Sequence, residues 1–224
     1  MVICFHGVDG SGKTSQAERL VSRLNEAGSP AVYAWTGGRT RLTQIGRRLI
    51  KGPVADGEEK PAAAQSAIRH RSSSRGVRQM ILRQPPVWML GLQVALLEHT
   101  MTIRRRVVPQ LSQGCIVVCD RYLYDAVVAA AAVVDAGSAS VRRLLRLASF
   151  YPVPRPARAF LLEIPAEVAL QRKNDIRDAD ALRKRIPLYR VAAEALAMQI
   201  VDATLPAEEV GEAIFARVQP LLGK

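Results

Sequence analysis

The chain has 224 residues, of which 49% are hydrophobic and only 5% aromatic, and its formal net charge is +12. This length suits one α/β domain with a sizeable core built mainly from Ala, Val, Leu and Ile. The longest apolar run, residues 126–134, has about half of the roughly eighteen residues that a membrane span needs, which excludes a membrane-spanning helix. The positive charge fits an anionic ligand or partner but does not choose one.

The strongest signal lies in the first fifteen residues. Residues 2–5 form a short apolar run that predicts a buried strand, and residues 16–27 have apolar side chains at helical spacing. Between them, Gly7-Val8-Asp9-Gly10-Ser11-Gly12-Lys13-Thr14 fits the pattern G-x-x-x-x-G-K-[ST] at every fixed position. In such a loop, backbone N–H groups curl around a polyphosphate, the lysine reaches its β- and γ-phosphates, and the hydroxyl holds Mg²⁺. We therefore predict ATP and Mg²⁺ as ligands, with these ATP-binding residues: Gly7, Asp9, Gly10, Ser11, Gly12, Lys13, Thr14 and Ser15.

The N-terminus and the cysteines indicate the compartment. The chain enters its first strand without the charged region and small-residue cleavage site of a secretion signal. Its three cysteines, Cys4, Cys115 and Cys119, lie in strand-like runs and are too few and too scattered for a metal site. We expect a cytoplasmic protein with reduced thiols.

The next part of the chain is basic. Residues 31–35 predict a second strand, residues 36–40 a loop, and residues 41–51 a short basic helix. Residues 51–86 have poor periodicity and many Pro, Gly, Ala and Ser, which predicts a flexible basic insertion. Because this insertion has no aromatic residues between its arginines, it does not favour nucleic acid as a partner.

The middle of the chain adds a second group of charged residues. Residues 87–113 predict a long helix divided near Pro109, and residues 115–119 a fully apolar strand. Asp120, Arg121 and Tyr122 follow this strand. Ligands of open α/β sheets bind at the carboxyl ends of strands, so we expect these side chains to face the same crevice as the phosphate loop.

Strands and helices continue to alternate after Tyr122. Residues 123–134 predict a helix that is apolar nearly all round, which implies burial against another helix or a second subunit. The charged residues 175–185 lack apolar periodicity and predict a mobile loop. The other predicted elements are helices at 141–150, 165–174, 188–198 and 206–222 and strands at 159–164 and 199–202. This alternation favours a five-stranded parallel sheet with helices on both faces.

Several motifs together resemble one family. They are the phosphate loop, Asp120-Arg121-Tyr122, the segment Leu162-Glu163-Ile164-Pro165-Ala166-Glu167-Val168-Ala169-Leu170-Gln171-Arg172, Tyr189, and Val201-Asp202-Ala203. In this order they are similar to the thymidylate kinase family of nucleoside monophosphate kinases. The resemblance implies a P-loop NTPase fold, a single kinase domain over residues 1–224, a lid over about residues 175–185, and a homodimer.

The resemblance also implies roles for individual residues. Asp9 would contact the acceptor's sugar, and Thr14 would hold the metal. Asp120 would help to place the metal or the attacking oxygen, and Arg121 would hold a phosphate between donor and acceptor. Ser11 stands in the loop where some members have an arginine, which resembles members that draw an arginine from the lid. That arginine would be Arg172, Arg177, Arg183 or Arg185. The predicted catalytic residues are Lys13, Asp120, Arg121, Arg172, Arg183 and Arg185.

Departures from the family pattern concentrate on the acceptor side. Family members usually have Arg-Glu-Pro-Gly-Gly-Thr after the second strand, where this chain has Trp35-Thr36-Gly37-Gly38-Arg39-Thr40. His99 stands where the family has a thymine-reading arginine, Asp125 where a serine is common, and His6 where a glutamate is frequent. The predicted acceptor-binding residues are Asp9, Gly38, Arg39, His99, Arg121, Tyr122 and Asp125. We favour His6 as a hydrogen-bonded histidine at a strand end.

These departures leave three functions open. The first is transfer of the γ-phosphoryl group of ATP to a nucleoside monophosphate, with dTMP as the leading acceptor. The second keeps the ATP site but uses another small anionic or hydroxylic metabolite as acceptor. The third is a non-catalytic, ATP-responsive module whose basic insertion binds a polyanion.

Overall fold

The computed structural model describes residues 1–37, 84–172 and 179–222. The chain forms two compact units, one made of Met1–Gly38 with Leu96–Lys224 and the other of Arg39–Ala95. The described part of the second unit is the beginning of one helix. The helix predicted for residues 41–51 lies outside the described residues. So does the insertion predicted for residues 51–86, apart from its last three residues.

A parallel sheet forms the centre of the first unit. Its strands are β1 (Val2–His6), β2 (Ala31–Trp35), β3 (Ile116–Asp120), β4 (Arg158–Glu163) and β5 (Gln199–Asp202). They are paired in the order β2-β3-β1-β4-β5, and every pair is parallel. All residues of β1 and β3 are buried, which explains why both strands are apolar up to their last residues, His6 and Asp120. The prediction of a five-stranded parallel sheet is confirmed.

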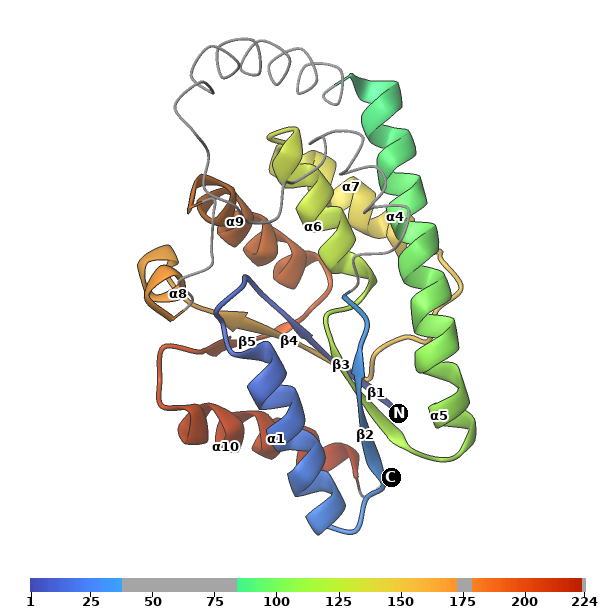
Figure 1. The fold of residues 1–224 in the computed structure, drawn as a ribbon, viewed down its shortest axis with the longest axis vertical. Helices are drawn as coiled ribbons and strands as arrows, with labels where there is room; N and C mark the ends of the chain where they lie inside the picture. The colour runs from blue at the N-terminus through green and yellow to red at the C-terminus, as the bar shows by residue number, and fades with distance from the viewer. Residues whose placement is uncertain (38–83, 173–178, 223–224) are drawn as a thin grey trace, which may run out of the picture. The chain divides into compact units, whose positions relative to one another are not determined.

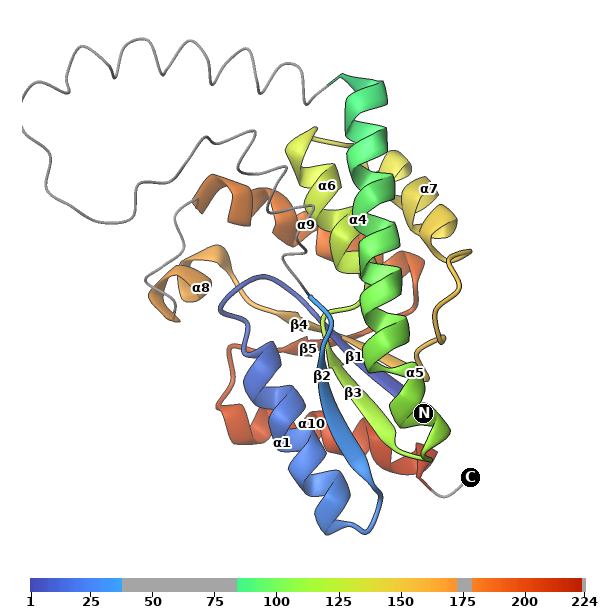
Figure 2. The ribbon, with the colours of Figure 1, turned by 45° about the vertical axis from the view of Figure 1, so that its right-hand side comes forward.

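Helices cover both faces of this sheet (Figure 1). α1 (Lys13–Glu26) and α10 (Ala207–Val218) lie on one face, and α10 is followed by the short 3₁₀ helix η2 (Gln219–Leu221). α6 (Leu123–Val133), α7 (Ser138–Ala148) and α9 (Ala179–Ala195) lie on the other, and α8 (Ala166–Arg172) lies near the loop between β1 and α1 (Figure 2). α6 packs against α7 and α9, so neighbouring helices of the same chain bury most of its apolar surface.

The long helix predicted for residues 87–113 is divided as expected. α4 (Pro85–Arg106) and α5 (Val108–Ser112) are separated at Val107. Pro109 has no N–H to donate to the carbonyl of Arg105, so one helical hydrogen bond is missing at the division. Val107 and Ile103 are fully buried, and the amide of Val107 still donates to the carbonyl of Ile103 at 2.8 Å.

The loop predicted for residues 175–185 is partly wrong. Residues 175–178 lie outside the described residues, but 179–185 form the first turns of α9. Leu182, Ile186 and Tyr189 follow one another at helical spacing, and Leu182 and Tyr189 are buried. The charged residues between them conceal this pattern. The lid itself stays a prediction.

Two further expectations concern membrane-spanning helices and the cysteines. Within the described ranges, no helix has the length and apolarity to cross a lipid bilayer. Cys4, Cys115 and Cys119 are free thiols, and Cys4 and Cys119 are buried.

Candidate active site

The phosphate loop, residues 7–14, connects β1 to α1. Gly12 closes the loop in the left-handed region, with φ of 83°, and caps the N-terminus of α1. Gly10 also has a positive φ, and a Cβ atom there would lie 2.8 Å from the carbonyl oxygen of Ala169 in α8. The N-terminus of α1 presents its dipole and free N–H groups to this loop, which favours an anion.

Lys13 lies across the loop. Its Nζ donates hydrogen bonds to the carbonyl of Val8 at 2.6 Å and to the hydroxyl of Ser11 at 3.3 Å. Only 6% of the residue is exposed. Burial first, and then the positive charge of Arg121, lower the pKa of Lys13 to about 8. The ammonium group therefore lies in a site where it lacks a full negative partner, as expected of a group that binds phosphate.

Thr14 and Asp120 meet beside Lys13. The Thr14 hydroxyl donates to Oδ2 of Asp120 at 2.5 Å, and the Tyr33 hydroxyl donates to the same oxygen at 3.3 Å. The other oxygen, Oδ1, is buried and has no hydrogen-bond partner among the described residues. Such an unpaired carboxylate oxygen beside a hydroxyl fits Mg²⁺, which prefers oxygen ligands and usually takes only one or two from the protein. Accordingly, the described residues contain no group of three or more His, Cys, Asp or Glu that could hold a metal.

Arg121 has an unusual backbone conformation. Its φ of 70° lies in the left-handed region, which costs a non-glycine residue about 1–2 kcal/mol. Thr36 holds this conformation, because its amide donates to the carbonyl of Asp120 at 3.2 Å and its hydroxyl to the carbonyl of Arg121 at 2.6 Å. Gly37 leaves room for the side chain, since a Cβ atom there would lie 2.1 Å from Cδ of Arg121.

The guanidinium group of Arg121 lies between two carboxylates. Nη2 donates to Oδ1 of Asp9 in the phosphate loop, and Nη1 lies 3.5 Å from Oδ1 of Asp125 in α6. Burial opposes the charge of Arg121, but Tyr189, Asp125, Asp9 and Asp120 outweigh burial and raise its pKa. Arg121 is therefore a fixed positive charge next to the loop.

His99 belongs to the same electrostatic group. Burial lowers the pKa of His99, and the charges of Asp125 and Arg121 act on it in opposite directions. Its Nδ1 is buried without a hydrogen-bond partner among the described residues. His6 donates from Nδ1 to Oδ2 of Asp125 at 2.7 Å, as expected for a hydrogen-bonded histidine at a strand end.

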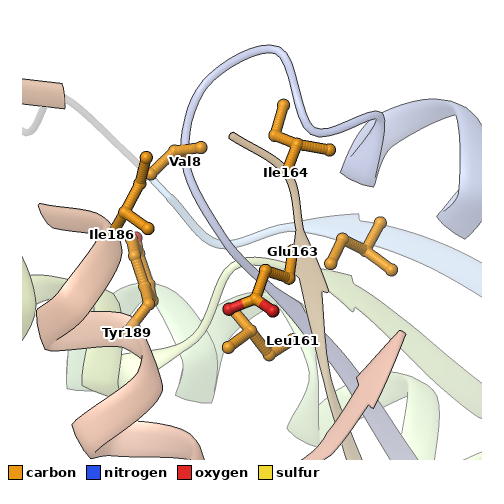
Figure 3. A pocket seen from close by; sticks show the side chains of 7 residues that line it. Val8, Leu161, Glu163, Ile164, Ile186 and Tyr189 are labelled. Atoms are coloured by element: carbon orange, nitrogen blue, oxygen red, sulfur yellow. The ribbon is translucent and has the colours of Figure 1, made fainter. Parts of the chain in front are cut away.

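α9 reaches the phosphate loop from the other side. A small pocket, of about 10 Å³, lies between Val8 of the loop, Glu163 of β4, and Ile186 and Tyr189 of α9. Figure 3 shows the side chains that line it. Glu163 also accepts two hydrogen bonds from Arg190 of α9, at 2.5 and 2.9 Å. These contacts hold α9 across the carboxyl end of β4.

The structure brings some of the predicted site residues together and leaves others apart. Those brought together around the phosphate loop are Asp9, Ser11, Lys13, Thr14, His99, Asp120, Arg121 and Asp125. Tyr122 is not among them, because its side chain is fully buried and its hydroxyl donates to the carbonyl of Pro154. Gly38, Arg39 and Arg177 lie outside the described residues.

The three described lid arginines also differ. Arg172 donates to the carbonyls of Ala203 at 2.7 Å and Thr204 at 3.3 Å, after β5. Arg183 is exposed and pairs with Asp180 at 3.4 Å. Arg185 alone of these three has a buried Nε that no described residue satisfies.

Sequence reasoning missed the residues that support Asp120 and Arg121. They are Tyr33, Thr36 and Gly37, the last of which leaves space for the side chain of Arg121. Tyr33 and Thr36 reach their partners because β2 pairs with β3, with Trp35 opposite Asp120. The sequence gives no sign of these contacts with Asp120 and Arg121, since they depend on strand register.

Comparisons with known proteins agree on one family. The family model for thymidylate kinase matches residues 77–214. A probable thymidylate kinase of Pyrococcus abyssi is 28% identical over 231 residues, covering 99% of this chain and 97% of the relative. Thymidylate kinases of Symbiobacterium thermophilum and Thermomicrobium roseum are 27% and 28% identical, each over 98% of this chain and over 93% and 95% of their own length.

Proposed function

Because the chain belongs to the thymidylate kinase family, we propose that it transfers the γ-phosphoryl group of ATP to a nucleoside monophosphate, with dTMP as the acceptor. One observation carries this proposal: Lys13, the pair Thr14–Asp120, and Arg121 converge where β1 and β3 end side by side. Phosphoryl transfer depends mainly on positioning and on neutralising the charge of the moving group. This set of residues supplies both.

On the donor side, the residues of the loop bind the polyphosphate. Backbone N–H groups of residues 7–14 and the N-terminus of α1 attract its oxygens. Lys13 exchanges its contacts with Val8 and Ser11 for phosphate oxygens, which restores a negative partner to a buried ammonium. This charge then stabilises the transferred group as negative charge develops.

Thr14 and Asp120 would hold Mg²⁺. The buried and unpaired Oδ1 of Asp120 supports this assignment, and Tyr33 orients the carboxylate through its other oxygen. When bound, the ion supplies charge neutralisation at the phosphate oxygens.

On the acceptor side, Arg121 binds the acceptor's phosphate and Asp9 contacts its sugar. The hydrogen bond that Arg121 donates to Asp9 supports this assignment, because it keeps the two groups next to each other. His99 lies within electrostatic reach of both Arg121 and Asp125, so it can contact the acceptor beside them.

The test is ADP production from ATP and Mg²⁺, with each common ribo- and deoxyribonucleoside monophosphate supplied separately. Turnover stimulated by dTMP above the others is expected. Stimulation by another monophosphate would favour a different acceptor, for which His99 in place of an arginine is the supporting observation. Absence of turnover with every monophosphate would contradict the proposal.

We also propose that the protein acts as a homodimer in the cytoplasm. Exposed apolar residues on α4 and α5, namely Leu97, Met101 and Val108, support the dimer. Free thiols support a reducing compartment that also supplies ATP.

A further inference from the structure

A buried carboxylate behind Arg121 connects four elements of the fold. Oδ2 of Asp125 accepts hydrogen bonds from His6 Nδ1 at 2.7 Å and from the amide of Tyr122 at 2.9 Å. Oδ1 accepts from the Tyr189 hydroxyl at 2.7 Å and lies 3.5 Å from Arg121 Nη1. Asp125 in α6 therefore touches the end of β1, the residues after β3, and α9.

These contacts leave the carboxylate no capacity for a ligand. A carboxylate has about four acceptor positions, and the contacts of Asp125 occupy that number. Its side chain is also only 5% exposed. Burial would raise its pKa, but His6, Arg121 and the amide of Tyr122 together hold the pKa of Asp125 well below its usual range. Asp125 is thus ionised, and all of its acceptor positions are filled by groups of the protein itself.

The two carboxylates that hold Arg121 differ in accessibility. The side chain of Asp9 is 43% exposed, whereas that of Asp125 is 5% exposed. Water or a ligand can replace Arg121 at Asp9 more easily than at Asp125, because the carboxylate of Asp9 is the more exposed of the two. Separating Arg121 from the buried Asp125 would leave an unpaired charge inside the protein, which is strongly unfavourable.

We propose that Asp125, held in place by His6, is the positioning residue that anchors Arg121, and that Asp9 is the partner that Arg121 exchanges for the acceptor's phosphate. This inference rests on the function proposed above. Asp125 touches Arg121 rather than the acceptor, so it acts through the guanidinium. It also fixes Tyr189, which lies one helical turn after Arg185 on the same side of α9.

His6 is the second half of this anchor. It is fully buried, and its Nδ1 supplies one of the hydrogen bonds to Asp125. Without that donor, the Asp125 carboxylate loses one hydrogen bond and is positioned less firmly. The position of Arg121, which depends on Asp125, then becomes less well defined.

A double-mutant cycle on kcat/KM tests this inference. Asp125→Asn alone is expected to raise the KM for the acceptor roughly tenfold to hundredfold, as for loss of a charged hydrogen bond, while the KM for ATP stays the same. In an Arg121→Lys background, the same change should alter kcat/KM less than about threefold, because the interaction is already broken.

A second pair of variants tests the same inference in case Asp125→Asn does not fold. His6→Leu removes the donor, whereas His6→Asn keeps an N–H near the position of Nδ1. Acceptor affinity should fall more in His6→Leu than in His6→Asn. Additive effects in the cycle, or equal increases of both KM values, would overturn the inference alone. Wild-type protein that phosphorylates no monophosphate would overturn the proposed function, and this inference with it.

Discussion

The position of the Arg121 side chain depends on the absence of a side chain at Gly37. A Cβ atom at Gly37 would lie 2.1 Å from Cδ and 3.0 Å from Cβ of Arg121, so Gly37→Ala must displace that side chain. We expect kcat/KM for the acceptor to fall at least about tenfold, since misplacing a positioned group by about 1 Å can cost hundredfold. Steady-state kinetics with varied acceptor measures this effect.

Gly137→Ala is the matched control for this substitution. Gly137 precedes α7 with φ of −70°, and a Cβ atom there meets nothing within 4 Å. Its replacement should lower stability by up to about 1 kcal/mol, because glycine is preferred to alanine at an N-cap, and should leave turnover as in the wild type. Equal kinetic effects of the two substitutions would contradict the steric role of Gly37.

Lys13 predicts a pH dependence of ATP binding. Its pKa of about 8 in the free protein means that the ammonium loses its proton as the pH rises through that value. Bound phosphate favours the charged form and raises this pKa, so from about pH 8 upward binding takes up a proton and affinity falls as the pH rises. Titration calorimetry of ATP binding in buffers of different ionisation enthalpy measures this proton uptake. It should find uptake at about pH 8.3 and little at about pH 6.5.

The Lys13→Ala variant separates this proton from others. It should keep the fold, lose the uptake, and lose at least about a hundredfold in turnover, as for removal of one preorganised charge. Uptake that persists in Lys13→Ala would assign the proton to another group. Turnover that persists would contradict the assigned site.

At the level of residues, the sequence predicts what local motifs and strand ends determine. Lys13, Thr14, Asp120 and Arg121 were found this way, because a loop pattern or the end of an apolar run marks each of them. The hydrogen bond from His6 to Asp125 joins residues 119 positions apart. Such a pair requires the order of strands and the packing of α6, which no local pattern contains.

At the level of elements, α9 shows where periodicity misleads. Charged residues interrupt its apolar positions, and Pro187 lies inside the helix. Proline removes one helical hydrogen bond, but packing of Leu182 and Tyr189 maintains the helix through it. β1 and β3 were easier to predict, because burial on both faces makes each of them a short apolar run.

α9 also gives a prediction about the catalytic arginine. Arg185 has a buried Nε without a partner among the described residues, which suits a group that pairs with a phosphate when ligands bind. Arg185→Ala should lower kcat by about 10²–10³, as for loss of one transition-state contact. Single-turnover kinetics with saturating ATP and acceptor measures the chemical step.

Arg183 on the same helix provides the control. It is exposed and pairs with Asp180 one turn away, so Arg183→Ala should change kcat by less than about threefold. A large effect of Arg183→Ala with a small effect of Arg185→Ala would reverse the assignment. Similar effects of both would indicate a change in α9 itself.

At the level of the whole molecule, topology places the site. The order β2-β3-β1-β4-β5 puts β1 and β3 side by side, and their connections leave in opposite directions, toward β2 and β4. A crevice opens at such a point, outside the carboxyl ends of the two strands. The phosphate loop follows β1 and Arg121 follows β3, so donor and acceptor groups meet there although more than a hundred residues separate Asp9 from Arg121.

Assembly is the remaining prediction at this scale. The apolar helix α6, for which the sequence left open burial against another helix or a second subunit, is covered by α7 and α9. Leu97 and Met101 instead lie one turn apart on α4, 49% and 55% exposed, and Val108 on α5 is 42% exposed. An exposed apolar row of this kind is typical of an interface, so sedimentation at micromolar concentration should show a dimer that Met101→Glu dissociates. Leu147→Glu on α7, where the side chain is 50% exposed, should leave the dimer intact. A dimer that only Leu147→Glu disrupts would move the interface to α7, and a wild-type monomer would contradict the assembly itself.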